Sequence, residues 1–177
     1  DLETLPRVTT ETGIPSGDWD LTEEKRGPFY LDLYLAQFKR GYKYTFIYNM
    51  FDSHLYPYGM FYSNGTPKPA ATYLHNLTTI LADSGSIASP RVLNYSIPCQ
   101  PATVHDLLLQ KSNGKFYLVL WGEKYSGGSN NVIINLGSTC SSVKIYDPTV
   151  GSSAIQNLNN VNLTTLSISD HPLIVEI

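Results

Sequence analysis

The chain has few charged residues and no excess of positive charge. Of its 177 residues 15% are charged, and 12 Lys and Arg against 15 Asp and Glu give a formal net charge of −3. Nucleic acid binding requires a basic surface that displaces phosphate counterions, so this balance argues against a nucleic acid partner. The chain is nevertheless 42% hydrophobic, which is typical of a folded protein and not of a disordered one.

Long hydrophobic runs are also missing. The run Phe116–Trp121 is among the longest apolar stretches, and it has the length of a strand. A helix needs roughly 20 apolar residues to cross a bilayer, so we expect no membrane span.

Several catalytic and cofactor-binding motifs are absent. The four histidines, His54, His75, His105 and His171, are scattered singly without the His/Cys/Asp spacing of a zinc site. The pair Gly127-Gly128 lies between two β-runs and does not open a helix, so it is not a phosphate loop. No Gly-x-Ser-x-Gly nucleophile elbow occurs. We therefore expect neither a metal nor a cofactor.

Cysteines are few, and they bear on the compartment together with glycosylation motifs. Cys99 and Cys140 either form one disulfide in an oxidising compartment or are two unrelated buried thiols. Low-charge chains generate some Asn-x-Ser/Thr sequons by chance. The sequons begin at Asn64, Asn76, Asn94 and Asn162. Together these features predict a secreted, extracellular glycoprotein with a Cys99–Cys140 disulfide.

The residues that are present divide into two unlike parts, and the first covers 1–86. Its pattern alternates strand and helix, which predicts two units of a parallel α/β fold. The expected elements are a strand over Arg7–Thr10, a helix opened by Gly27-Pro28 and closed by Gly41, a strand over Tyr44–Tyr48 and a helix over Ala70–Leu81. The second strand is β-branched and aromatic throughout, so we expect it to be buried on both faces.

The second part, over 87–177, shows the two-residue period and tight turns of an all-β domain. The apolar runs 106–111 and 115–121 flank Ser112-Asn113-Gly114, and an Asn-Gly turn between such runs is a strong hairpin signal. Further strands are expected over 131–136, 142–146, 163–168 and 173–176. Short strands punctuated by Gly, Pro and Asn predict an antiparallel β-sandwich.

One carboxylate lies where a strand is expected to end. Glu11, in Thr10-Glu11-Thr12-Gly13, follows a short β-run and precedes Gly13-Ile14-Pro15. At such a sharp exit from a strand a side chain is able to point into a cleft instead of a core. The other interpretation is a surface glutamate beside a turn.

The order of these segments resembles the end of a clan A glycoside hydrolase. The matching segments are VTTETG over Val8–Gly13, YTFIYNMFD over Tyr44–Asp52, GMFY over Gly59–Tyr62 and KPA over Lys68–Ala70, while Val104–Trp121 resembles part of the β-sandwich appended to the barrel. The resemblance covers nearly the whole chain. It implies the last two βα units of a (β/α)8 TIM barrel followed by a β-sandwich, with a carbohydrate substrate.

The resemblance also implies site residues. The glutamate that ends strand seven is the nucleophile of a retaining mechanism, which maps to Glu11, and the acid/base residue comes from strand four, outside this chain. Strand eight of the clan commonly ends in a tryptophan that floors the sugar subsite, and Tyr48 takes that place here. The other expected substrate contacts are Asn49, Asp52, His54 and Trp19, with Tyr56 and Tyr58 as further residues that line the cleft.

Two functions remain open from the sequence. Two βα units cannot close a barrel, so we expect the hydrolase to act only with a companion N-terminal polypeptide that supplies the other strands. The alternative is a non-catalytic carbohydrate-binding or interaction protein built on a β-sandwich.

Overall fold

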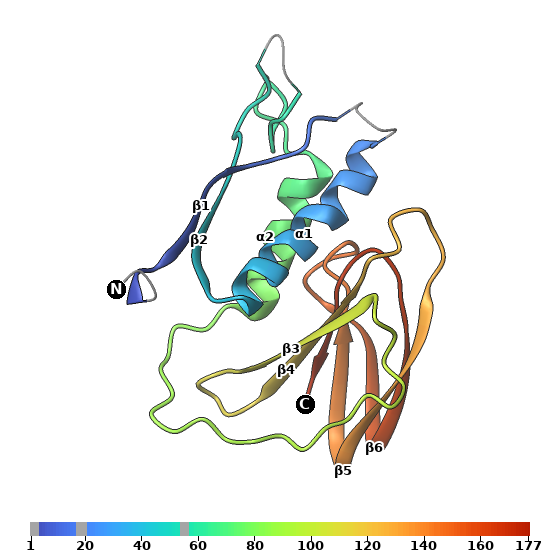
Figure 1. Ribbon diagram of the computed structural model, residues 1–177. Helices are drawn as coiled ribbons and strands as arrows, with labels where there is room; N and C mark the ends of the chain where they lie inside the picture. The colour runs from blue at the N-terminus through green and yellow to red at the C-terminus, as the bar shows by residue number, and fades with distance from the viewer. Residues whose placement is uncertain (1–3, 17–20, 54–56) are drawn as a thin grey trace. The chain divides into compact units, whose positions relative to one another are not determined.

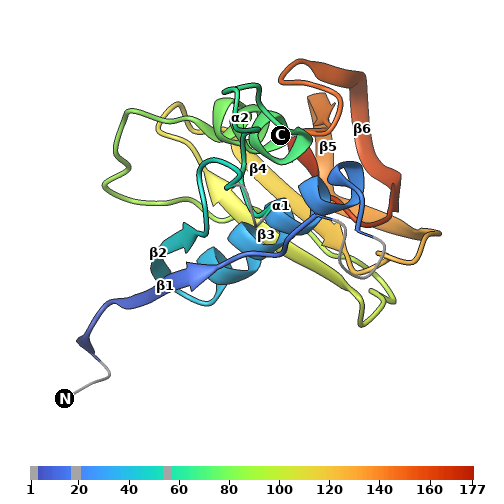
Figure 2. The ribbon, with the colours of Figure 1, turned by 90° about the horizontal axis from the view of Figure 1, so that it is seen from above.

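The computed structural model describes residues 4–16, 21–53 and 57–177. The chain divides into two compact units, residues 1–75 and 76–177 (Figures 1 and 2). This division falls inside helix α2, Pro69–Leu81, whereas the sequence pattern places the boundary after residue 86.

A parallel pair of strands forms the sheet of the first unit. Strand β1, Arg7–Thr12, pairs in parallel with β2, Tyr42–Ile47, and helix α1, Glu23–Lys39, connects them. The two strands run side by side in both ribbon views (Figures 1 and 2). A parallel pair requires such a crossover, so the alternation of strand and helix predicted from the sequence is present.

Helix α1 begins earlier than the sequence pattern indicates. We expected Gly27-Pro28 to open the helix, but it starts at Glu23, and Pro28 lies inside it. Thr22 is the N-cap, since its Oγ1 accepts a hydrogen bond from Lys25 N at 3.4 Å. A threonine cap followed by acidic residues is favourable at a helix N-terminus. These signals outweigh the preference of proline for the first helical position.

Only one face of β2 is covered, which corrects the prediction that this strand is buried on both faces. Ile47 is half-buried, whereas Tyr44 is 53% and Phe46 56% exposed. On the covered side, Thr9 Oγ1 of β1 donates to Gln37 Oε1 of α1 at 3.0 Å. A layer of helix therefore lies on one face, and the described residues place no second layer on the other.

The core of the first unit lies between α1, the start of α2 and the loop that follows β2. It is built on Tyr30, Met60 and Ala70, with Ile47 among the partly buried residues around them. Gly27 allows α1 to approach the first turns of α2, because a Cβ there would overlap the Tyr73 ring. No helix among the described residues is both long enough and apolar enough to span a membrane.

The second unit contains one five-stranded antiparallel sheet in the order β3-β4-β7-β5-β6. Its strands are β3 Val104–Gln110, β4 Phe116–Gly122, β5 Asn130–Tyr146, β6 Ala154–Ile168 and β7 Leu173–Glu176. The hairpin at Ser112-Asn113-Gly114 is confirmed, and Gly114 has the positive φ of +86° that favours glycine in this turn. The antiparallel domain is present, but residues 76–177, all of which are described, do not show a second sheet packed as in a sandwich.

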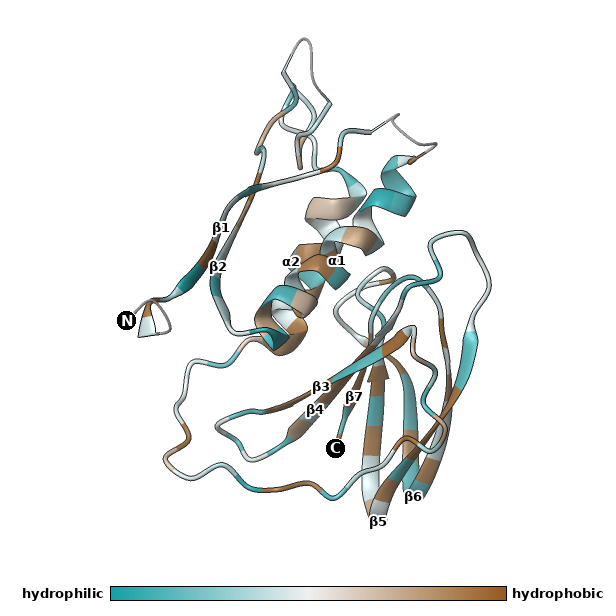
Figure 3. Cartoon of the chain, viewed as in Figure 1, coloured by the Kyte–Doolittle hydropathy of each residue, from teal (hydrophilic) through white to brown (hydrophobic). Residues whose placement is uncertain are grey.

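The burial pattern explains the sheet's core. All seven residues of β4 are buried, and in β5 exposed and buried residues alternate over 131–136. The hydropathy colours of Figure 3 accordingly change between hydrophilic and hydrophobic along β5. The core includes Leu118, Ile134, Ile145 and Ile168. Strand β5 is continuous where the sequence predicts two strands. Its pairing with β6 is irregular between Asn135 and Cys140. This irregular stretch contains most of the break between the two strands predicted over 131–136 and 142–146.

The structure describes the two cysteines and all four sequon asparagines. Cys99 is an exposed free thiol and Cys140 a half-buried one, so the structure does not contain the predicted disulfide. Asn64, Asn94 and Asn162 are exposed. The fourth sequon is more constrained, because Asn76 Nδ2, the atom that would carry a glycan, donates to Pro148 O at 2.8 Å.

A half-buried histidine joins two turns of the second unit. His171 Nδ1 lies 2.8 Å from Asp170 Oδ1, and its Nε2 lies 3.3 Å from Asp147 Oδ2 in the turn after β5. Burial lowers the pKa of His171, but hydrogen bonds to Asp147 and Asp170 and their negative charges outweigh burial and raise it to about 9. The protonated ring is therefore the form that holds the turns together.

This arrangement predicts a loss of stability in mild alkali. The folded pKa of about 9 lies above the ordinary value of 6.5. The contribution of His171 is therefore complete below about pH 6.5 and is lost as the pH rises through 9, on the order of 3 kcal/mol in all. His171→Gln should flatten the free energy of unfolding over this range in denaturant titrations, whereas His75→Gln, at an exposed position, should keep the wild-type slope. Parallel slopes for all three proteins would contradict the assignment.

Candidate functional site

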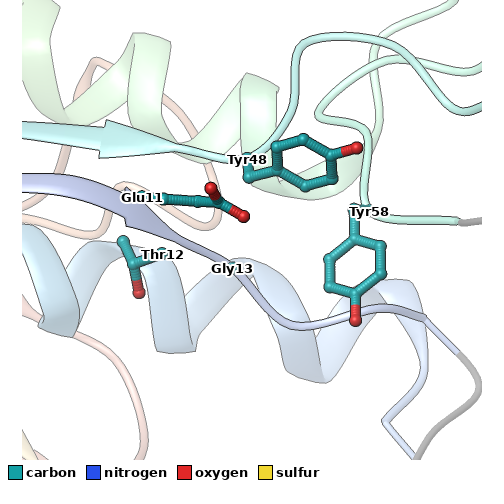
Figure 4. A pocket seen from close by; sticks show the side chains of 5 residues that line it. All are labelled: Glu11, Thr12, Gly13, Tyr48 and Tyr58. Carbon is teal, nitrogen blue, oxygen red and sulfur yellow. The ribbon is translucent and has the colours of Figure 1, made fainter.

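A cavity opens at the carboxyl ends of the two parallel strands. It has a volume of about 460 Å³ and is lined by Glu11, Thr12, Gly13, Tyr48 and Tyr58 (Figure 4). The carboxyl ends of parallel strands are the usual place for a site in α/β folds. Glu11, Tyr48 and Tyr58 therefore line one cavity. The sequence predicts the first two as site residues and Tyr58 as a further residue that lines the cleft.

A bulge in β1 directs Glu11 into this cavity. Thr9 pairs with Thr45 and Thr12 with Ile47, so β1 carries one more residue than β2 over this stretch. Both Thr9 and Thr12 are half-buried, while Thr10 and Glu11 between them are exposed. An extra residue in a strand re-aims the side chains beside it. Figure 4 accordingly shows Glu11 directed toward Tyr48 and Thr12 directed to the opposite side of the strand.

The backbone of the two strands stays in contact beyond their formal ends. Tyr48 N donates to Thr12 O at 2.7 Å, and a Cβ at Gly13 would collide with the carbonyl oxygen of Tyr48. The Tyr48–Asn49 peptide bond that follows is cis. Gly13 thus allows the exits of β1 and β2 to lie against each other, which keeps Glu11 and Tyr48 at one edge of the sheet.

Two tyrosines form the aromatic wall of the cavity. The rings of Tyr48 and Tyr58 meet edge to face, with centroids 5.7 Å apart and planes at 72°. Tyr48 is 42% exposed and Tyr58 is half-buried. Such a pair offers an apolar ring face together with hydroxyl groups, the combination that suits a sugar.

The other predicted contacts are placed differently. Asp52 Oδ1 accepts hydrogen bonds from Lys68 Nζ and from Gly59 N, both at 2.8 Å, so its carboxylate organises the loop. Asn49 does not line the cavity, and its buried Oδ1 has no hydrogen-bond partner among the described residues. Trp19 and His54 lie outside the described residues. Thr12 and Gly13 also line the cavity, at the end of a strand whose bulge the sequence did not reveal.

The described residues that line the cavity bring to it one carboxylate, from Glu11, and two phenols, from Tyr48 and Tyr58, while the side chain of Thr12 points to the opposite side of the strand. Glu11 is exposed and is the acidic side chain among the lining residues. A carboxylate is able to attack a carbon centre or accept a proton, but glycoside hydrolysis by retention uses two carboxyl groups about 5–5.5 Å apart. Across the described residues no group of three or more His, Cys, Asp or Glu side chains could hold a metal ion.

Comparison with known proteins relates this geometry to an enzyme fold. One similar structure is a family 39 glycoside hydrolase from the gut symbiont Bacteroides cellulosilyticus WH2, with a TM-score of 0.71 and 13% identity over 98% of this chain. The chain has the fold of part of a glycoside hydrolase. The catalytic domain of GH30 xylanase C from Talaromyces cellulolyticus is also similar, with a TM-score of 0.59 and 12% identity over 98% of the chain.

The likeness is one of structure, and it covers part of each neighbour. The chain spans 34% of the first neighbour and 40% of the second. No protein-family profile and no curated protein matches the sequence. At these identities the comparison shows the fold, which is that of part of a glycoside hydrolase structure as the resemblance in the sequence predicted.

The close approach at Gly13 gives a direct test of the site's framework. Gly13→Ala should force the exits of β1 and β2 apart and lower the free energy of unfolding by about 1–3 kcal/mol, because the new methyl group overlaps backbone atoms that cannot rotate away. Gly151→Ala is the matched control, since a Cβ there meets nothing within 4 Å. Denaturant titration measures both, and equal effects would contradict the close contact.

Proposed function

We propose that this chain is the C-terminal part of a secreted retaining O-glycoside hydrolase and that Glu11 is its nucleophile. The observation that carries the proposal is the position of Glu11. It lies at the carboxyl end of a parallel strand, and a bulge directs it into a cavity walled by Tyr48 and Tyr58. The likeness to two glycoside hydrolase structures supports the reaction class.

The proposed chemistry assigns one half of the reaction to this chain. The Glu11 carboxylate attacks the anomeric carbon as a second carboxyl group protonates the departing glycosidic oxygen, which leaves a glycosyl ester on Glu11. The second group then removes a proton from water, and the resulting attack on the same carbon releases the sugar and restores Glu11. Among the described residues no other carboxylate lines the cavity, so we assign the acid/base group to a companion polypeptide.

The open face of the two-stranded sheet supports the need for that companion. Val8 is 38%, Tyr44 53% and Phe46 56% exposed, and Figure 3 places apolar residues on these strands. Exposed apolar surface of this kind marks an interface. The similar structures extend well beyond the part that this chain matches. We therefore assign the face to an N-terminal barrel portion that continues the sheet and buries these side chains.

The wall of tyrosines defines the substrate class. Tyr48 and Tyr58 offer ring faces against which a sugar stacks and hydroxyls that pair with sugar hydroxyls.

The exposed Asn64, Asn94 and Asn162 are the proposed glycan sites of a secreted protein. The Cys99–Cys140 link and a glycan on Asn76 stay predictions from the sequence.

A second function is supported by the presence of one carboxylate, that of Glu11, among the described residues that line the cavity. A cavity with stacking tyrosines and one acid group is able to bind a sugar without cleaving it, and the second unit has a core of its own. This alternative is a non-catalytic carbohydrate-binding protein. Intact-mass analysis of native material separates the two, because the hydrolase requires a companion carrying the remaining strands, whereas the binding protein is folded and monodisperse without it.

Replacing the nucleophile tests the proposed reaction. In the assembled enzyme, Glu11→Gln should lower kcat on the order of 10³-fold or more, because the amide keeps the shape of the side chain but cannot form the glycosyl ester. Sugar affinity should change by less than about threefold, since the amide still pairs with hydroxyls. Steady-state kinetics with an aryl glycoside and equilibrium binding measure the two effects.

The control for this variant is Glu24→Gln, which removes an exposed carboxylate of α1 outside the cavity. It should leave kcat and KM at the wild-type values. Full activity in Glu11→Gln would eliminate Glu11 as the nucleophile. Bound sugar without turnover in the wild-type assembly would instead favour the non-catalytic alternative.

A further inference from the structure

One buried arginine is linked by hydrogen bonds to both of the loops that carry the cavity, to one through Tyr30 and to the other directly. Arg26, in α1, is 0% exposed and is not among the residues that line the cavity. One of the loops follows β1 and continues from Glu11 and Gly13. The other follows β2 and carries Tyr58.

The contact with the first loop passes through Tyr30, one turn further along α1. Arg26 Nη2 donates to the Tyr30 hydroxyl at 3.3 Å. That hydroxyl accepts a hydrogen bond from Ile14 N at 3.0 Å and lies 3.4 Å from Ile14 O, to which it donates. Ile14 is the third residue after Glu11, so this chain of bonds fixes the backbone directly behind the carboxylate.

The contact with the second loop is direct. Arg26 Nη1 donates to Gly59 O at 2.9 Å, and Nη2 donates to Tyr58 O. The same two loops also meet each other, because Ser16 N donates to Pro57 O at 3.0 Å. The guanidinium therefore holds the backbone on which the Tyr58 ring is mounted.

Nearby carboxylates balance the charge of Arg26 and offset the cost of burying it. Its Nη1 lies 3.1 Å from Glu23 Oε2, and the other oxygen of Glu23 lies 2.7 Å from Lys68 Nζ, which in turn contacts Asp52. Two cations and two carboxylates thus form one cluster with no net charge. Within it the planar fork of arginine reaches several acceptors in fixed directions, which a lysine ammonium cannot reproduce.

We propose that Arg26 is a positioning residue that sets the two walls of the sugar cleft, the Glu11 wall and the Tyr58 wall, at their working separation. This inference rests on the proposed function for its sugar, but the coupling of the two loops is a property of the chain itself. Arg26 touches neither the cavity nor the proposed reacting atoms. It acts through Tyr30 and through the Tyr58–Gly59 backbone.

Hydrogen exchange of the chain tests the coupling without any assumption about activity. Arg26→Lys keeps the charge but loses the fork, so the amides of Ile14, Ser16 and Gly59 should exchange about tenfold faster or more, while amides in the middle of α1 keep their rates. Arg40→Lys is the matched control, since Arg40 is exposed at the other end of the same helix, and it should change none of these rates.

A milder variant separates the two contacts. Tyr30→Phe removes the hydroxyl alone, so it should speed exchange at Ile14 and leave Gly59 at the wild-type rate. A uniform rise at all amides in both variants would mean that Arg26 only stabilises the unit. No change at either loop in Arg26→Lys would also overturn the proposal.

Kinetics of the assembled enzyme then test whether the coupling serves the cleft. Arg26→Lys should raise KM for an aryl glycoside about tenfold with a smaller change in kcat. In a Tyr58→Ala background it should raise KM about threefold or less, because the Tyr58 ring is already gone and only the contact through Tyr30 to the Glu11 wall is left to lose. An undiminished effect in that background would overturn the role through Tyr58. If Glu11→Gln stays fully active while the exchange results hold, the proposed reaction fails and the positioning of the loops stands.

Discussion

The site depends on the pairing of two short parallel strands with one extra residue in the first. If β1 and β2 paired without the bulge, strict alternation would turn Glu11 to the same face as Thr9, toward α1. The added residue restores Thr12 to the helix face and leaves Glu11 on the other. Tyr48, bonded through its backbone to Thr12, then stands beside the carboxylate. A one-residue irregularity thus determines whether this chain presents a carboxylate to a cavity.

The two faces of that sheet differ in burial, and this difference is the main unusual feature of the first unit. One face is covered by helix, and the other presents Tyr44 and Phe46 to solvent. Burial of apolar side chains is the main favourable term in folding, so such a face is expected to be covered in the functional protein. In the second unit the interior strand β4 is buried throughout and the inner positions of β5 join the core, while Ile133, Ile155 and Leu163 on β5 and β6 are 43%, 50% and 52% exposed.

Local signals were sufficient for most elements. The Asn113-Gly114 turn, the second helix and the last strand lie where their patterns predict, because turn chemistry and periodicity act over a few residues. The start of α1 was wrong, since the cap at Thr22 competes with Pro28 and only the packing of the first turn shows which prevails. The aromatic run of β2 was also misjudged. The hydrophobic side chains of β2 favour burial on both faces. Whether both faces are buried depends on which layers pack against the sheet.

The sequence by itself determined the order of strands and helices, the strand exit at Glu11 and the two-part character of the chain, because these follow from local patterns of residues. Tertiary structure alone decided that Glu11, Tyr48 and Tyr58 meet, that Asp52 organises its loop with Lys68, and that Arg26 joins both loops. A crossover and a bulge bring these groups together. Contacts between residues far apart in the sequence produce no periodic pattern from which they could be predicted.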